Sequence, residues 1–493
     1  MKYDLGLIGI AVMGENLALN VVNNGYSVIV SSRKQKTVDT FLSGRAKDKK
    51  IHGTTNLLEL VENLKKPRKI LLMIKSGSPV DNVISQLLPI LEKGDMIIDG
   101  GNSNYHDTIR RELHLKNHGI YFLGVGVSGG EEGALIGPSI MPGGSHDAWI
   151  HLKEMFQKIS AKVDGVPCCD WLGENGSGHF VKMVHNGIEY GDIAIINEAY
   201  NILKNYLKLD NSRISEIFSD WNKSELDSYL IEITSDILKY KEKNGAFLVD
   251  NILDVAGQKG TGKWTVSSSL EHGVPLTLVS EAVFSRFLSS QKEERVKASK
   301  LFLEEKNSYV GDVTEFIDIV KRGVYLSKIL SYTQGYALMR KASKFHNWNL
   351  DFGKIALLWR GGCIIRSVFL NKIHEAFERN PNLENLLFDS YFISEVKNNI
   401  YSLRQLVSHS SLAGIPIPSI SSSLSYFDGY TSKVLPANLL QAQRDFFGAH
   451  TYERVDKPRG EFFHTDWTGK GGKTSSTTYN LSLIHISEPT RPY

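Results

Sequence analysis

The sequence predicts an α/β domain built on a parallel sheet, followed by a large all-α domain and a C-terminal tail. Two observations carry this prediction. Short β-branched runs alternate with amphipathic stretches in the first third of the chain, whereas helical spacing dominates the remainder. Strands that alternate with helices indicate βαβ crossovers, and such crossovers produce parallel sheets.

Buried strands are expected in five segments of the first third, with mostly helical segments between them. The expected strands cover residues 5–10, 27–30, 70–74, 96–99 and 120–123. Further along, residues 181–206, 212–239 and 315–345 show helical spacing.

Glycine placement suggests where the domains divide. Three glycines within residues 173–178 interrupt regular structure. We therefore expect a first domain over 1–177, a helical domain over 178–434 and a tail over 435–493. The end of the tail, about 475–493, has neither a helical nor a strand period and resembles translated sequencing-adapter read-through, so it is expected to be non-native.

Composition excludes several classes of protein. A chain of 493 residues has room for about three domains, and 41% hydrophobic with 23% charged residues excludes global disorder. The net charge of +3 is too small for a whole-chain nucleic-acid or membrane binder, so anions must meet local clusters. Three cysteines form neither a disulfide framework nor a usual zinc site, and no metal is expected. Together with an N-terminus unlike a secretory signal, this predicts a cytoplasmic protein.

A glycine-rich turn follows the first expected strand. Gly9-Ile10-Ala11-Val12-Met13-Gly14 leads directly into an amphipathic segment. In a dinucleotide site Gly9 permits the tight turn, Ala11 lets the pyrophosphate approach the backbone, and Gly14 lets the helix pack closely. The amides at the helix start then face the phosphates. A merely tight turn is the alternative, but the position directly after residues 5–8 favours a Rossmann-like dinucleotide-binding domain.

The end of the second expected strand indicates which dinucleotide binds. An NAD site would place an acid there for the ribose 2′-hydroxyl. This chain instead has Ser31-Ser32-Arg33-Lys34. A solvated basic loop is the alternative, yet two cations at this position suit a 2′-phosphate, so NADP is the predicted cofactor.

A polar stripe is predicted on the helix after residue 177. Its members recur every three or four residues and so share one helix face: Lys182, His185, Asn186, Glu189 and Tyr190. Val181, Val184 and Ile188 form the apolar stripe that packs into the core. A solvated face with an i,i+4 ion pair is the alternative. Histidine and asparagine on the same line favour a site for proton transfer beside hydride transfer, in which an unprotonated lysine takes a hydroxyl proton. For that, its ordinary pKa of about 10.4 must fall by about 3.

Other polar groups are further candidates. The turn Ser128-Gly129-Gly130 suits a carboxylate, although a flexible surface loop is as good a reading. The segment 257–264 suits a phosphate but lacks the Walker spacing. Arg286, Arg444 and His450 are additional phosphate candidates.

With these motifs the chain resembles the 6-phosphogluconate dehydrogenase family, decarboxylating NADP enzymes of the pentose phosphate pathway, from residue 3 to about 468. The resemblance rests on the first glycine turn, Asp99-Gly100-Gly101-Asn102-Ser103, the segments 126–134 and 178–192, and Ala442-Gln-Arg-Asp-Phe-Phe-Gly-Ala-His450. It implies oxidation of 6-phosphogluconate at C3, loss of CO2, and protonation of the enediol to ribulose 5-phosphate.

The resemblance also implies roles for individual residues. Lys182 would be the general base and Glu189 the acid that protonates C1. Substrate would be bound by Asn102, Ser128, Gly129, Gly130, His185, Asn186, Tyr190, Lys259, Thr261 and Arg286, with Arg444 and His450 supplied across a homodimer by tail exchange. The cofactor would be bound by Gly9, Ala11, Val12, Met13, Gly14, Ser32, Arg33, Lys34, Ile74, Lys75 and Asn102.

One departure concerns the cofactor. The family often has Asn-Arg-Thr where this chain has Ser32-Arg33-Lys34, which keeps the arginine contact and puts the threonine contact in doubt. Two other functions stay open. One is a β-hydroxyacid dehydrogenase for a small unphosphorylated acid, and the other is a non-catalytic NADP- or sugar-phosphate-binding protein. No nucleic-acid or membrane partner is expected.

Overall fold

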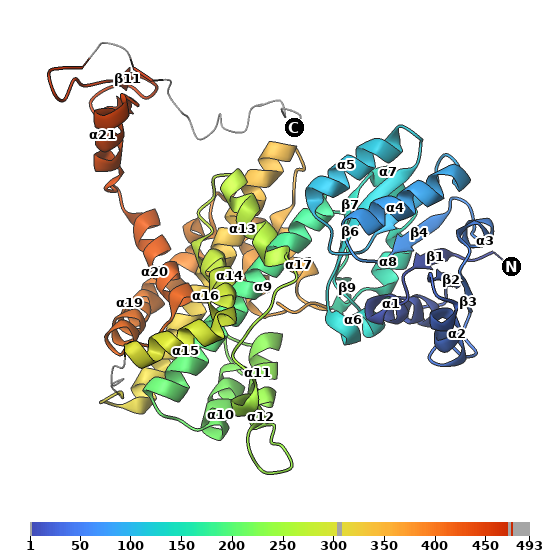
Figure 1. The fold of residues 1–493 in the computed structure, drawn as a ribbon, viewed down its shortest axis with the longest axis horizontal. Helices are drawn as coiled ribbons and strands as arrows, with labels where there is room; N and C mark the ends of the chain where they lie inside the picture. Colours follow the sequence, from blue (N-terminus) through green and yellow to red (C-terminus); the bar gives the residue numbers. More distant parts are fainter. Residues whose placement is uncertain (1, 303–307, 472–474, 477–493) are drawn as a thin grey trace. The chain divides into compact units, whose positions relative to one another are not determined.

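The computed structural model describes residues 2–302, 308–471 and 475–476 (Figure 1). The chain divides into two compact units, residues 1–424 and 425–493. The first unit contains a seven-stranded sheet and, after it, a large group of helices. The predicted fold class, a Rossmann-like α/β domain followed by an all-α region, is confirmed.

The sheet has the strand order β3-β2-β1-β4-β5-β6-β7. Its strands are β1 (Leu5–Ile8), β2 (Val28–Ser31), β3 (Ile51–Thr54), β4 (Lys69–Leu72), β5 (Met96–Asp99), β6 (Tyr121–Val127) and β7 (Ile140–Gly144). All five expected strands are present, and β3 and β7 are additional. The pairings from β1 to β6 are parallel, as expected. At one edge the chain turns back through a short helix after β6 and pairs β7 antiparallel to it, Val127 opposite Ile140.

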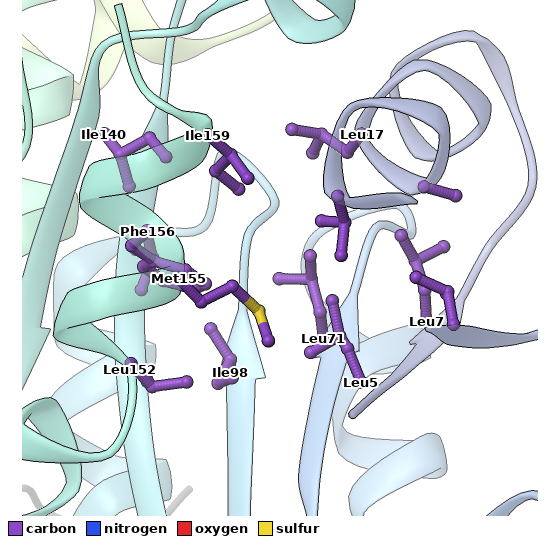
Figure 2. Packing of buried hydrophobic residues seen from close by; sticks show 14 of the residues in the cluster. Leu5, Leu7, Leu17, Leu71, Ile98, Ile140, Leu152, Met155, Phe156 and Ile159 are labelled. Carbon is purple, nitrogen blue, oxygen red and sulfur yellow. The ribbon is translucent and has the colours of Figure 1, made fainter. Parts of the chain in front are cut away.

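Two helical layers cover the sheet. One face is packed by α1 (Val12–Asn23), α2 (Gln35–Ser43), α6 (Gly130–Ile136), α7 (His146–Ile150) and α8 (Lys153–Ile159), and the other by α3 (Leu57–Glu62), α4 (Ser78–Leu87) and α5 (Tyr105–Lys116). Alternate residues of each strand point to opposite layers, as Leu7 and Ile8 do in β1. Figure 2 shows the first layer, where Met155 of α8 points toward Ile98 and Leu71 of the strands.

The helical region begins with α9 (Ser177–Asn201), which ends in a π-helical turn, η2 (Ile202–Tyr206). Its other helices are α10 (Asn211–Trp221), α11 (Tyr229–Lys239), α12 (Leu248–Asn251), α13 (Thr261–Glu271), α14 (Thr277–Ser290), α15 (Lys292–Leu301), α16 (Val313–His346), α17 (Phe352–Leu358), α18 (Phe369–Arg379), α19 (Ser390–Leu412) and α20 (Pro418–Thr431). The long helix α16 packs against both α9 and α19. The helical stretch expected over 212–239 is two helices, since turns over residues 222–228 separate α10 from α11.

Short elements complete the described chain. They are the 3-10 turns η1 (Leu88–Ile90) and η3 (Leu386–Phe388) and the strand pair β8 (Lys162–Val163) with β9 (Val166–Pro167). Within the described residues no helix has the length and apolarity needed to cross a bilayer.

The second unit is organised around one buried carboxylate. It contains α21 (Ala437–Gly448) and the antiparallel pair β10 (Tyr452–Glu453) and β11 (Phe462–Phe463). Asp445 of α21 accepts hydrogen bonds from the backbone amides of Thr451 and Thr465 and from the indole of Trp467, at 2.9–3.1 Å. The segment expected to be non-native falls largely on residues 477–493, which lie outside the described residues, and that expectation stays a prediction.

Candidate active site

The glycine turn after β1 has the backbone conformation that its sequence predicts. Gly9 has φ +108°, and a Cβ there would lie 2.3 Å from the Met73 carbonyl oxygen. A Cβ on Gly14 would lie 1.9 Å from the Gly9 carbonyl oxygen. Both positions therefore exclude a side chain, and α1 can begin directly beneath the turn.

Strand order brings the expected cofactor residues to one edge of the sheet. Because β1 lies between β2 and β4, the turn at Gly9 is flanked by Ser32–Lys34 on one side and by Ile74 and Lys75 on the other. This is the point where the strand order reverses, and ligands of such sheets bind outside the carboxyl ends of the strands there. Arg33, Lys34 and Lys75 are exposed, so their charges can reach a bound anion.

Asn102 is held at the end of β5 by a buried acid, Asp99, whose role the sequence did not predict. Asp99 is fully buried and accepts hydrogen bonds from the Gly101 amide at 3.1 Å and the Ser103 hydroxyl at 2.6 Å. The buried guanidinium of Arg111 approaches the same carboxylate at 3.5 Å. These contacts fix the backbone on both sides of Asn102 while its side chain stays exposed.

Helix α9 enters against the sheet with almost no space between the two backbones. A Cβ on Gly126 of β6 would lie 2.4 Å from the Cβ of Lys182, and one on Gly124 would lie 2.7 Å from the His179 ring. Glycines in β6 thus let the second turn of α9 lie on the strand. As a result Lys182 is placed beside the turn that follows β6.

The polar stripe of α9 is internally connected, with Lys182, His185 and Tyr190 buried and Asn186 and Glu189 half-buried. Lys182 Nζ donates to Asn186 Oδ1 at 2.7 Å and lies 3.4 Å from His185 Nδ1. On its other side His185 Nε2 lies 3.5 Å from the hydroxyl of Ser128, and Glu189 is 3.9 Å from His185 Nδ1. The structure contradicts the alternative of a solvated face, since Lys182 is 6% exposed and His185 fully buried.

Burial shifts the protonation of this stripe toward its neutral forms. Desolvation lowers the pKa of Lys182, although the nearby Glu189 and Cys363 oppose the change. Desolvation also raises the pKa of Glu189, against the opposing charges of Lys182 and Arg286. The pKa of His185 is well below its ordinary value, because its burial and the adjacent Lys182 both disfavour the cation. A neutral amine and a protonated carboxyl group are the forms that a base and an acid require.

The turn Ser128-Gly129-Gly130 is not a flexible surface loop. Ser128 is buried, and its amide donates to the Ser139 carbonyl at 3.0 Å. Gly129 has φ +112°, and a Cβ there would meet the Gly362 carbonyl at 2.6 Å. Gly362 belongs to a segment between α17 and α18 that the sequence reading did not single out. The Gly361-Gly362 pair was its one visible signal.

The same segment between α17 and α18 closes the far side of the stripe. The ring of Trp359 packs edge-on against His185 with 5.5 Å between centroids, and Cys363 is buried beside it. Burial raises the pKa of the Cys363 thiol to about 12, so the group stays neutral. The segment therefore supplies apolar cover rather than charge.

The expected phosphate-binding residues lie at two places near the stripe. Thr261 begins α13 and accepts a hydrogen bond from Asn186 Nδ2 at 3.2 Å, with Lys259 exposed just before it. The guanidinium of Arg286 on α14 stacks on the ring of Tyr190 at 3.6 Å and donates to the Gly257 carbonyl. Asn102, Lys182 and Thr261 line one small cavity, which joins the sheet edge to the helices.

Arg444 and His450 belong to the second unit. Arg444 donates to Gln441 at 2.9 Å, and His450 Nδ1 lies 3.0 Å from the Ser476 hydroxyl. Both of these contacts lie within the second unit.

Comparisons with known proteins agree with this geometry. Residues 4–173 match the sequence model of the NAD binding domain of 6-phosphogluconate dehydrogenase, and residues 178–467 match that of its C-terminal domain. The decarboxylating 6-phosphogluconate dehydrogenase of Aggregatibacter actinomycetemcomitans is 55% identical over 482 residues, 98% of this chain and 100% of the relative. The human enzyme is 55% identical over 97% of this chain and 99% of its own length.

A solved structure shows the same architecture. Plasmodium falciparum 6-phosphogluconate dehydrogenase, described in its apo form and in complex with NADP+ and with 6-phosphogluconate, superimposes with a TM-score of 0.91 at 46% identity. The match covers 94% of this chain and 100% of that one. A dinucleotide turn, a buried lysine–glutamate stripe and near-complete coverage in sequence and structure lead to one assignment: the chain belongs to the 6-phosphogluconate dehydrogenase family.

Proposed function

We propose that this protein oxidises and decarboxylates 6-phosphogluconate to ribulose 5-phosphate and CO2, with reduction of NADP. The observation that carries the proposal is the buried stripe of α9, in which an amine and a carboxyl group are both biased toward their neutral forms beside the dinucleotide edge. The relatives named as decarboxylating 6-phosphogluconate dehydrogenases support it.

Lys182 is the proposed base of the oxidation. Its neutral amine takes the proton of the C3 hydroxyl while the C3 hydride leaves, and NADP, when bound, supplies the hydride acceptor. The resulting 3-keto acid loses CO2 as the C1–C2 bond breaks and its electron pair forms the enediol. Lys182 returns its proton to the keto oxygen in this step, which leaves the amine neutral again.

Glu189 is the proposed acid of the last step. It donates a proton to the carbon that has lost CO2, C1 of the product, while the neutral Lys182 takes the proton of the C2 hydroxyl, so that the enediol becomes the ketose. His185 and Asn186 hold substrate oxygens, and the Asn186 side chain already bridges Lys182 and Thr261. Ser128, Gly129 and Gly130 bind the carboxylate, while Tyr190, Lys259, Thr261 and Arg286 bind the phosphate end.

NADP is the proposed cofactor because the residues at its expected site suit a 2′-phosphate. Gly9 and Gly14 leave the space that a pyrophosphate needs, with Ala11, Val12 and Met13 between them. Ser32, Arg33 and Lys34 receive the 2′-phosphate in place of the acid that would favour NAD. Ile74 and Lys75 line the opposite side of the turn, and Asn102 lies between cofactor and substrate.

We also propose a homodimer in which the tails are exchanged, so that Arg444 and His450 complete the partner's substrate site. The proposed division is a cofactor domain over 1–177, a helical domain over 178–434 and an exchanged tail over 435–493. Three buried, unpaired cysteines support a reducing compartment such as the cytoplasm.

One assay tests the function. Purified protein should reduce NADP when given 6-phosphogluconate and release one CO2 for each NADPH, with a much lower kcat/KM for NAD. Two further substrates test the other enzyme function, gluconate without phosphate and a small β-hydroxyacid. Turnover of either in preference to 6-phosphogluconate would replace the assignment, and binding of NADP without turnover of any substrate would favour a non-catalytic sensor.

A further inference from the structure

The polar stripe of α9 continues beyond the proposed site as a buried negative charge. Asp192 lies three residues after Glu189 on the same helix and is 3% exposed. Its Oδ2 accepts hydrogen bonds from Lys328 Nζ at 2.7 Å and from the Tyr332 hydroxyl at 3.3 Å, both on α16. Lys328 is itself 6% exposed, so an ion pair lies inside the helix interface directly behind the site.

Stability alone is a weak reason for this pair. Two buried charges lose much of their hydration, and apolar residues of similar volume usually stabilise such an interface as well or better. Leu226, Val324 and Ile231 already provide apolar packing around it. A role for the charge itself is therefore worth testing.

The second carboxylate oxygen of Asp192 lies beside a small buried cavity. Among the described residues neither Asp192 Oδ1 nor the Ser228 hydroxyl has a hydrogen-bond partner, although both atoms are buried. Asp192, Ser228 and Lys328 line one small cavity with room for about one water molecule. A water held there would donate to the carboxylate. Burial raises the pKa of Asp192, and the contacts from Lys328 and Tyr332 oppose that rise.

Glu189 is surrounded by groups from three elements. Lys182 and the neutral His185 lie on its own helix, Arg286 reaches it from α14, and the neutral Cys363 comes from the segment after α17. Burial is the largest cause of its raised pKa. Lys182 and Arg286 lower that pKa, and Asp192 raises it. Asp192 thus opposes, in part, the two cations that favour loss of the Glu189 proton.

We propose that Asp192, clamped by Lys328, is a positioning residue whose fixed negative charge keeps Glu189 protonated until the enediol has formed. The inference rests on the proposed function, because it uses Glu189 as the acid for C1. It assigns the Asp192–Lys328 pair a purpose in catalysis without any contact to substrate.

The test measures the reverse of the Glu189 step. In D2O with NADPH present, the holoenzyme should exchange one C1 hydrogen of ribulose 5-phosphate, and proton NMR follows its loss. Here Glu189 acts as a carboxylate base, so the exchange rate rises as pH rises through its pKa. In Asp192→Asn this rising limb should move to lower pH by about one unit.

Two variants separate charge from packing. Tyr332→Phe removes one hydrogen bond to Asp192 but keeps the charge, and its limb should move by less than about 0.3 pH unit. Asp192→Asn combined with Lys328→Met removes both charges, and it serves if the single variant does not fold. The pH at which its exchange rate rises should also be lower than that of the wild type. This result would show that an unpaired Lys328 is not the cause of the shift.

The outcomes distinguish this inference from the proposed function. If the wild type oxidises 6-phosphogluconate but both Asp192 variants keep its limb to within about 0.2 pH unit, the role of Asp192 is wrong. An equal displacement in Tyr332→Phe would also contradict it, because packing would then be the cause. A wild type that neither oxidises 6-phosphogluconate nor exchanges the hydrogen overturns the function itself.

Discussion

The two charged regions of the site differ in their exposure to solvent. Arg33 and Lys34 stand exposed at the end of β2, where solvent and salt screen their fields. Lys182 and Glu189 lie within α9, where burial changes which protonation state they adopt. The exposed cations can select an anion by attraction, whereas in the buried region the pKa of Lys182 is lowered and that of Glu189 is raised, which favours the neutral forms that exchange protons. Changes in the buried region should therefore alter turnover, and changes in the exposed region should alter apparent affinity.

The largest effect is expected from Lys182→Met. Loss of a positioned base should lower kcat by about a thousandfold, since general bases contribute about 10²–10⁴ in rate. The rate of NADPH formation measures this. Calorimetric binding of 6-phosphogluconate is the control and should persist. A variant with near-normal turnover would show that another group is the base.

Glu189→Gln should have the next largest effect, lowering kcat by about a hundredfold. Because burial raises the pKa of Glu189, the wild-type acid stays protonated to higher pH than an ordinary carboxyl group, and the rate of C1 protonation falls as pH rises through that pKa. The variant should lack this alkaline decline in a kcat–pH profile. If the variant's profile keeps the alkaline decline, a group other than Glu189 causes it.

Arg33→Ala tests the exposed region. Losing one charge-assisted contact to a 2′-phosphate should raise the KM for NADP about tenfold, with little change in kcat or in the KM for NAD. The increase in the KM for NADP caused by Arg33→Ala should become smaller at high salt, because salt screens the exposed charge. Lys36→Ala, an exposed lysine on the adjacent helix α2, is the matched control. Equal effects on the two cofactors would remove the argument for NADP selection.

The smallest effect is expected outside the site, at Glu112 of α5. Burial and the nearby Glu174 raise its pKa to about 7. The folded protein therefore binds a proton there that the unfolded chain has lost, and this group's contribution to stability falls as pH rises from about 4.5 to 7. Glu112→Gln should stabilise the protein by about 1–2 kcal/mol at pH 8 and hardly at all at pH 4.5.

Thermal unfolding at the two pH values measures this difference. Glu62→Gln, an exposed acid in the same domain, is the control and should change neither melting temperature. A gain at both pH values would mean that the effect of Glu112→Gln does not come from its charge. Desolvation would then not be the general cause invoked for Lys182 and Glu189.

Sequence patterns predicted the stripe of α9 because helical spacing alone places Lys182 and Glu189 on one face. They did not predict β3 or β7. The residues of these strands fit the neighbouring helices and do not alternate between apolar and polar side chains. Gly53 makes room for Val38 of α2, and Gly143 in β7 lies where a Cβ would be 2.2 Å from the Gly178 amide. Such glycines weaken a strand pattern for reasons that only the neighbouring element explains.

The sequence also did not predict how deeply the stripe is buried. Lys182 and Glu189 taken alone are typical of a surface ion pair, and the ring that covers the stripe, Trp359 against His185, is more than 150 residues away in the chain. The roles of Asp99 and Asp192 were not predicted for the same reason. Their partners Arg111 and Lys328 meet them only after folding.

The backbone contact at the start of α9 has a mechanical consequence. Gly178 lies where a Cβ would be 2.3 Å from the Gly124 carbonyl oxygen and 2.5 Å from the Gly143 amide, so the first turn of the helix is wedged between β6 and β7. Lys182, the proposed base, lies one turn later and packs on Gly126 of the same strand, so we expect it to move together with the sheet. We therefore expect any closing motion around a substrate to come from the elements that approach α9 from its other side, with the proposed base already fixed relative to the cofactor edge of the sheet.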